Sequence, residues 1–280
     1  MYKHILAAVN EHLNSEIAAR YAVHLARASG ARLFFCFIDP KDLPRRDFGR
    51  AEEALQRLFL EAQEAGVAAE SITGAGDPVR EIGKIARQKM IDLVFASTRR
   101  EDVERRFYAG TVGRRLSLGL PCSVALVRVA HFGRIHPGKI LVPLKARISR
   151  IRERAYFTAK LASAFGSQVY VYHVARPMSS FLRGEVHLTP AEWERKRPAD
   201  ISAFLGLLRH ANVLQESRSV AGRSGKSIAV EAVARRHDLI VMGASERSLW
   251  SSLIRGNPVE RMLRETPCDL IILTPRRHED

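Results

Sequence analysis

The 280-residue chain has little cysteine, with three residues, Cys36, Cys122 and Cys268. Three cysteines cannot build the disulfide framework that stabilises many small secreted domains. Each lies in or at the start of an apolar segment, so we expect reduced, buried side chains and a cytoplasmic protein. No group of histidines and cysteines has the spacing of a metal site, and no metal ligand is predicted.

Long apolar runs are also missing. The first apolar run, Ile5 to Val9, is followed at once by Asn10, Glu11 and His12. It is too short for the core of a signal peptide, and no other run is long enough to span a membrane. With 46% hydrophobic and 27% charged residues, the composition is typical of an ordinary soluble globular protein.

Acidic residues are in the minority, because 45 Lys and Arg face 30 Asp and Glu, and the formal net charge is +15. This excess predicts attraction to polyanions. The alternative is that the arginine clusters are solvated helix faces. No helix-turn-helix signature, zinc spacing or RNA-binding aromatic motif is present, so a nucleic acid or an anionic membrane is a less favoured partner.

The chain contains an internal duplication. The segment Asp92-Leu93-Val94-Phe95 recurs as Asp238-Leu239-Ile240-Val241, and Pro121-Cys122 recurs as Pro267-Cys268 at the same spacing. The two halves also open alike, at residues 3–6 and 138–141. We therefore predict two domains, residues 1–131 and 132–280, with an insertion at about 176–198 in the second.

Each half alternates apolar strands with amphipathic helices. Gly30 is placed to end the first helix, and Asp77 with Pro78 is placed to begin another. Five strands joined by helices predict a doubly wound parallel sheet in each half. The expected strands are 3–9, 32–38, 67–73, 92–97, 122–129, 139–144 and 168–174, and the expected helices are 14–28, 52–65, 78–89, 111–118, 148–165 and 227–236.

The insertion has its own signals. Thr189-Pro190-Ala191-Glu192 predicts a helix start, and Pro198 is expected to end or kink that helix. The large apolar residues Phe181, Leu182 and Trp193 suit a lid, a partner-binding surface, or packing onto their own domain.

The run Asp238 to Gly243, then Gly256, then Pro267-Cys268 before an apolar strand, resembles the universal stress protein family. The resemblance covers nearly the whole chain as a tandem of two domains. It implies an adenine-nucleotide alpha-hydrolase-like, Rossmann-like fold and a non-catalytic stress-response function. It also implies an internal pseudo-dimer through the last strands, 123–129 and 270–274, and a homodimer or higher assembly through the same strands.

Many members bind ATP through a motif of Gly, two residues, Gly, nine residues, Gly, then Ser or Thr. In such a motif, glycine lets backbone amides close on phosphates, and the following helix N-terminus favours an anion. The second half places Gly243, Glu246, Gly256 and Asn257 at these positions, and the first half places Ser97, Arg100, Gly110 and Thr111. Glu246 would repel a phosphate unless Arg247 or a metal ion offsets its charge.

The resemblance therefore implies a ligand, ATP or another adenine nucleotide with Mg, in at least one half. The strand ends of a doubly wound sheet carry such sites, although the first-strand acid of nucleotide-binding members is replaced by Asn10 and Lys145. The candidate nucleotide-binding residues are Asn10, Ile38, Ser97, Arg99, Arg100, Gly110 and Thr111 in the first half, and Pro143, Val174, Gly243, Ala244, Ser245, Arg247, Gly256 and Asn257 in the second.

Other motifs are incomplete. Gly225-Lys226-Ser227 lacks the early glycine of a P-loop because Val220 stands there, and Gly74-Ala75-Gly76 lacks the third glycine of a dinucleotide fingerprint. The candidate loops offer no general base and no acid pair for magnesium, so no catalytic residue is predicted and a slow ATPase is the weakest hypothesis. An alternative is an interaction module without nucleotide, acting through its basic surface and the insertion.

Overall fold

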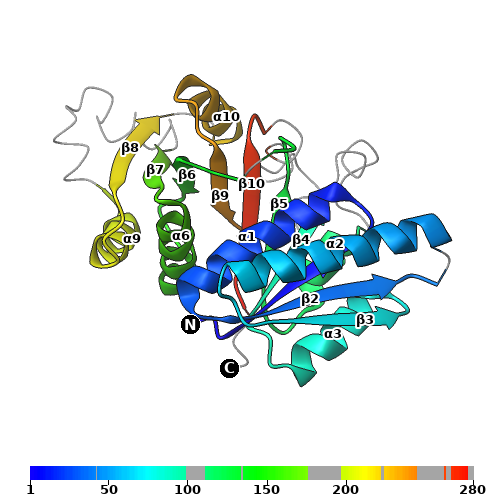
Figure 1. Cartoon of the computed structure of the whole chain (residues 1–280). Helices are drawn as coiled ribbons and strands as arrows, with labels where there is room; N and C mark the ends of the chain where they lie inside the picture. The colour runs from blue at the N-terminus through cyan, green and yellow to red at the C-terminus, as the bar shows by residue number, and fades with distance from the viewer. Residues whose placement is uncertain are drawn as a thin grey trace.

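The computed structural model describes residues 1–41, 43–98, 111–133, 135–175, 197–221, 224–244, 262 and 266–276. Strands and helices alternate along both halves (Figure 1). The first half contains β1 (His4–Val9), α1 (Leu13–Ser29), β2 (Arg32–Asp39), α2 (Arg45–Glu64), β3 (Ala69–Ala75), α3 (Pro78–Gln88), β4 (Leu93–Thr98), α5 (Val112–Gly119) and β5 (Ser123–Arg128). The second contains β6 (Lys139–Leu144), α6 (Ile151–Phe165), β7 (Gln168–Ala175), α9 (Ala199–His210), β8 (Gln215–Ala221), α10 (Ser224–Ala234), β9 (Leu239–Gly243) and β10 (Asp269–Thr274).

The described strands form one ten-stranded sheet in the order β3-β2-β1-β4-β5-β10-β9-β6-β7-β8. Pairing is parallel within each half, while β5 and β10 are antiparallel and place Leu126 opposite Ile272. The two halves therefore lie side by side in a single continuous sheet (Figure 1). The predicted doubly wound fold and the predicted internal pairing of the last strands are confirmed.

This topology bears on one expectation about assembly. A further copy of the chain was expected to associate through the last strands. Strand β5 is already paired with β4 and β10, and β10 is already paired with β9 and β5. Neither strand therefore has a free edge for strand pairing with a second chain.

Helices cover both faces of the sheet. One buried apolar cluster lies between the sheet and α1, α2, α6 and α9, and a second lies between the sheet and α3, α5 and α10. Central strands are apolar on both faces for this reason, as in the fully buried β5. In the described part of the chain, no helix combines the length and the apolar character needed to cross a membrane.

The starts of α2 and α6 differ from the prediction. Helix α2 begins at Arg45, seven residues before the predicted start, because Pro44 occupies the N-cap and Phe48 packs on Phe37 with ring centroids 5.4 Å apart. Helix α6 begins at Ile151 instead of residue 148. There Arg150 has a left-handed backbone, with φ of 55°, which ends the helical path before it reaches Ile148.

The second half shows elements that the sequence did not predict, α9 and β8. Pro198 is the N-cap residue of α9, so in the described structure it precedes a helix. The predicted helix at Thr189 and the apolar residues Phe181, Leu182 and Trp193 lie outside the described residues. Helix α10 begins at Ser224, three residues before its predicted start.

Candidate functional site

In the first half, Asn10 follows β1 at the carboxyl edge of the sheet. Its Oδ1 accepts the backbone N–H of His12 at 3.0 Å, and its own N–H donates to Ser15 Oγ at 3.0 Å. These bonds close the turn that leads into α1. The side-chain oxygen of Asn10, which stands in place of the family acid, is therefore engaged in a local turn.

Neighbouring strands bring other first-half candidates to the same edge. Ile38 near the end of β2 is buried, and Ser97 near the end of β4 is half-buried. Thr111 is the N-cap of α5, where its Oγ1 accepts the N–H of Arg114 at 3.4 Å. Arg99, Arg100 and Gly110 lie outside the described residues.

In the second half, Gly243 ends β9 and meets a side chain that the sequence did not single out. A Cβ at Gly243 would lie 1.4 Å from Nη1 and 2.1 Å from Cζ of Arg154. The guanidinium of Arg154, from the first turn of α6, thus occupies the space that any larger residue at 243 would fill. A side chain at position 243 would therefore have to displace the guanidinium.

The Arg154 guanidinium is held at the strand end by neutral groups. Its Nη2 donates to the carbonyl oxygen of Ala244 at 3.1 Å and to Ser149 Oγ at 3.2 Å. Its Nε is fully shielded from water and has no hydrogen-bond partner in the described part of the chain. Burial lowers the pKa of Arg154 to about 10, and the charge of Glu153 opposes that shift. The group remains a cation at neutral pH.

The remaining second-half candidates lie around this point. Ala244 is fully buried, and its N–H donates to the Leu273 carbonyl at 2.9 Å. Pro143 in β6 is half-buried, and Val174 belongs to the neighbouring strand β7. Ser245, Arg247, Gly256 and Asn257 lie outside the described residues, as does Glu246.

Further cations surround the second-half edge. Lys145, Arg147 and Arg150 follow β6 and are exposed. The acid of this stretch, Glu153, is directed elsewhere, because it accepts hydrogen bonds from Tyr2 Oη at 3.0 Å and from Ser123 Oγ in the first half. The carboxyl edge of the second half therefore gathers positive charge without a compensating acid from this segment.

The family assignment rests on two matches along the chain. The profile of the "Universal stress protein family" matches residues 1–128 and again residues 138–274. The chain belongs to the universal stress protein family. It carries two copies of the family domain, and the stress-response role of the family applies to it.

Relatives of this universal stress protein agree with the assignment. A protein of Thermus aquaticus, "Universal stress protein in QAH/OAS sulfhydrylase 3'region", is 29% identical over 127 residues, which cover 43% of this chain and 88% of the relative. A solved universal stress protein from Archaeoglobus fulgidus is 16% identical, with a TM-score of 0.64 over 99% of this chain and 97% of its own. A protein of unknown function from Pseudomonas aeruginosa PAO1 is 17% identical, with a TM-score of 0.67 over 98% and 93%. The two structures show that the fold of the chain is shared with proteins of similar length.

Sequence comparison of the two halves could have found Arg154. The C-cap glycines Gly30 and Gly166 align α1 with α6 and place Ala18 at the position of Arg154. The family motif places Ser97 at the position of Gly243. The first half thus has a small residue on the helix, and the second half has an arginine on the helix with glycine on the strand. This paired difference is the sequence signal that the motif alone did not give.

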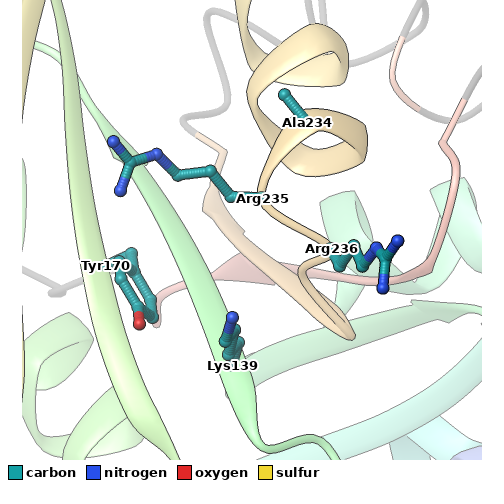
Figure 2. A pocket seen from close by; sticks show the side chains of 5 residues that line it. All are labelled: Lys139, Tyr170, Ala234, Arg235 and Arg236. Carbon is teal, nitrogen blue, oxygen red and sulfur yellow. The ribbon is translucent and has the colours of Figure 1, made fainter.

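A second feature lies at the opposite, amino edge of the second half. A surface depression of about 310 Å³ is lined by Lys139, Tyr170, Ala234, Arg235 and Arg236 (Figure 2). Lys139 begins β6, and the two arginines follow the last turn of α10. The depression is therefore separate from the strand ends at Gly243. Among the described residues, no three His, Cys, Asp or Glu side chains are arranged to hold a metal ion.

Proposed function

We propose that this universal stress protein is a non-catalytic stress-response protein that binds ATP or a related adenine nucleotide at the carboxyl edge of its second half. The observation that carries the proposal is the position of Arg154. Its guanidinium lies against Gly243, the first residue of the family motif in this half. We assign to it the contact with a phosphate group.

The physical argument concerns a cation that has no ion pair with a carboxylate among the described residues. A partly buried guanidinium without a carboxylate bears a desolvation cost that an anion would offset. Arginine binds phosphate through its guanidinium N–H groups, and Nη1 of Arg154, which lies over Gly243, makes no hydrogen bond among the described residues. A contact between Arg154 and a phosphate would replace the phosphate contact that is lost because the motif has Glu246 instead of glycine.

The first half offers a weaker site, so we propose one nucleotide per chain. Ala18 and Ser97 occupy the positions of Arg154 and Gly243 in the first half. The Thr111 hydroxyl caps α5 by accepting a backbone N–H. Magnesium would enter with ATP and take its oxygen ligands from the phosphates and water.

The test is isothermal titration with magnesium and ATP at a fixed ionic strength of about 0.15 M, because a basic protein attracts polyphosphates nonspecifically at low salt. We expect saturable binding at one site per chain. Arg154→Ala, which installs the first-half residue, is expected to weaken binding by about tenfold or more. Arg152→Ala is the matched control, since Arg152 is exposed, lies two positions earlier on the same helix and carries the same charge.

Two outcomes contradict the proposal. Equal affinity in wild type and Arg154→Ala would remove Arg154 from the site. Absence of saturable binding in wild type would reject nucleotide binding altogether and favour the interaction module without nucleotide.

A further inference from the structure

The depression at the amino edge of the second half is rich in positive charge. In Figure 2, Lys139 and Tyr170 come from neighbouring strands, and Arg235 and Arg236 follow the last turn of α10. The three basic side chains are exposed, and Tyr170 is half-buried. No acidic residue is among the five that line the depression.

Most of this charge is not paired within the described chain. Arg235 Nε contacts Glu231 at 3.0 Å, but the same carboxylate is shared with Arg218 at 3.5 Å. The ammonium of Lys139 and the guanidinium of Arg236 have no carboxylate within ion-pair distance among the described residues. Asp238 instead accepts the backbone N–H of Lys139 at 2.8 Å, a contact that leaves the ammonium available.

The floor of the depression is fixed. Tyr170 Oη donates to Gln168 Oε1 at 2.8 Å, and the tyrosine ring packs edge-on against buried His237 with centroids 4.9 Å apart. Gln168 in turn donates from Nε2 to Glu216 at 3.0 Å, so this nearby acid is bound by a neutral amide. The basic residues therefore share the lining of the depression with a tyrosine that is held by a hydrogen bond and a ring contact.

The first half serves as an internal comparison. Its equivalent positions hold His4 for Lys139, Phe34 for Tyr170, Lys89 for Arg235 and Met90 for Arg236. Lys89 contacts Glu70 at 2.7 Å and lies over the Phe34 ring, 5.5 Å from its centroid. Met90 and Arg236 share the same left-handed backbone, with φ of 50° and 52°. The fold at this place is thus common to both halves, while the unpaired cations belong to the second.

We propose that this depression is a second ligand site, for a small molecule carrying a diphosphate or a similar cluster of negative charges. Three cationic residues line a space of about 310 Å³, whose size suits a small polyanion more than a flat or extended one. This site does not depend on the nucleotide site at Gly243, since the two lie at opposite edges of the sheet.

The experiment uses inorganic pyrophosphate as the probe, titrated by calorimetry into the full chain. All proteins carry Arg154→Ala, so the proposed contact at the carboxyl edge is removed in each. The test variant adds Lys139→His and Arg236→Met, which are the residues of the first half at the same places and suit the shared backbone. The control adds Arg45→His and Arg46→Met, two exposed arginines at the start of α2 in the first half. Both variants lose the same charge.

We expect saturable pyrophosphate binding in the Arg154→Ala parent and in the control, with affinity lower by about tenfold or more in the test variant. Equal weakening in the test and control variants would show attraction to net charge only and overturn the proposal. Unchanged affinity in the test variant, or no saturable binding in the parent, would also overturn it. Circular dichroism of each variant checks that the comparison is between folded proteins.

These results are independent of the ATP titration. If ATP fails to bind at the carboxyl edge, Arg154→Ala changes nothing and the pyrophosphate series still reports on the amino edge. If the pyrophosphate series fails, the effect of Arg154→Ala on ATP affinity is unaffected.

Discussion

The hydroxyl of Tyr21 donates a hydrogen bond of 2.8 Å to the carboxylate of Asp269, and both residues are buried. Tyr21 lies on α1 of the first half, and Asp269 begins β10 of the second. The other carboxylate oxygen accepts the backbone N–H of Ala130 at 2.8 Å. Burial, and then the charge of Asp269, raise the pKa of Tyr21 well above its usual value, so the hydroxyl keeps its proton and remains a donor. The two halves are joined by this polar contact as well as by the β5 and β10 pairing.

Tyr21→Phe should destabilise the whole chain. The substitution leaves one oxygen of a buried carboxylate without its donor, which costs about 1–3 kcal/mol. Urea denaturation followed by circular dichroism measures the change in the free energy of unfolding. Tyr156→Phe is the control, since it removes a hydroxyl from a half-buried tyrosine on α6 for which the described structure shows no hydrogen bond. Equal losses in the two variants would contradict the role given to Asp269.

Gly243→Ala should displace Arg154 without changing any charge. The new methyl group would require the space of the guanidinium, and the arginine is the flexible partner. We expect ATP affinity to fall as it does in Arg154→Ala, measured by the same titration. Gly119→Ala is the control, because a Cβ at Gly119 meets nothing within 4 Å. An ATP affinity in Gly243→Ala equal to that of wild type would separate Arg154 from the ligand.

The stability of the protein should fall as the pH is lowered through the ordinary histidine range. Burial lowers the pKa of His237 and of His24 in the folded state, while the charge of Glu231 opposes the shift at His237 and that of Glu61 opposes it at His24. Below the unfolded pKa of about 6.5, these two histidines bind protons in the unfolded chain but stay neutral in the folded chain, so the free energy of unfolding decreases. Above that pH the two states are equally deprotonated and this contribution vanishes.

His237→Ile isolates one of these groups. The first half has buried Ile91 at the equivalent position, in the same apolar cluster that faces α3, α5 and α10. We expect the variant to lose less stability than wild type between about pH 7.5 and 5.5, in thermal melts at matched ionic strength. His131→Gln, at an exposed position, should follow the wild-type profile. A His237→Ile profile identical to that of wild type would assign the pH dependence to other groups.

The three cysteines should resist alkylation in the native protein. All are free and buried, as the sequence predicted, and burial raises the pKa of each thiol to about 12. Because the thiolate is the reactive form, iodoacetamide at about pH 8 should label none of them until urea unfolds the chain. Mass spectrometry counts the labels. Rapid native labelling at Cys122 or Cys268 would show that the segments just before β5 or β10 open locally without global unfolding.

Several details of the fold were predictable because their causes are local. Gly30 ends α1 in a left-handed conformation, and Asp77 caps α3 by accepting the N–H of Arg80 at 2.9 Å. The start of α2 was missed because its cause is a tertiary contact. Its first turns are polar and arginine-rich, and they are stabilised by Pro44 at the N-cap and by the packing of Phe48 on Phe37 of strand β2.

The candidate site was predicted only in part. The motif led to Gly243, Ala244 and Thr111, because glycines and the residue that opens a helix can be recognised from sequence. Arg154 was missed because it lies 90 residues from Ala244, and nothing near it in the chain indicates that the two will meet. The amino-edge depression was missed for the same reason, since it draws on two strands and the end of a helix.

The sequence by itself determined the duplication, the alternation of strands and helices, the family and the burial of the cysteines. These follow from apolar periodicity, turn and cap residues, and repeated segments, which are properties of neighbouring residues. Only the tertiary structure decided that β5 and β10 pair antiparallel and that each is flanked by a second strand, so that neither has a free edge. It also decided which cations lie together without a partner acid, because that depends on how distant segments pack and on where each carboxylate is already bound.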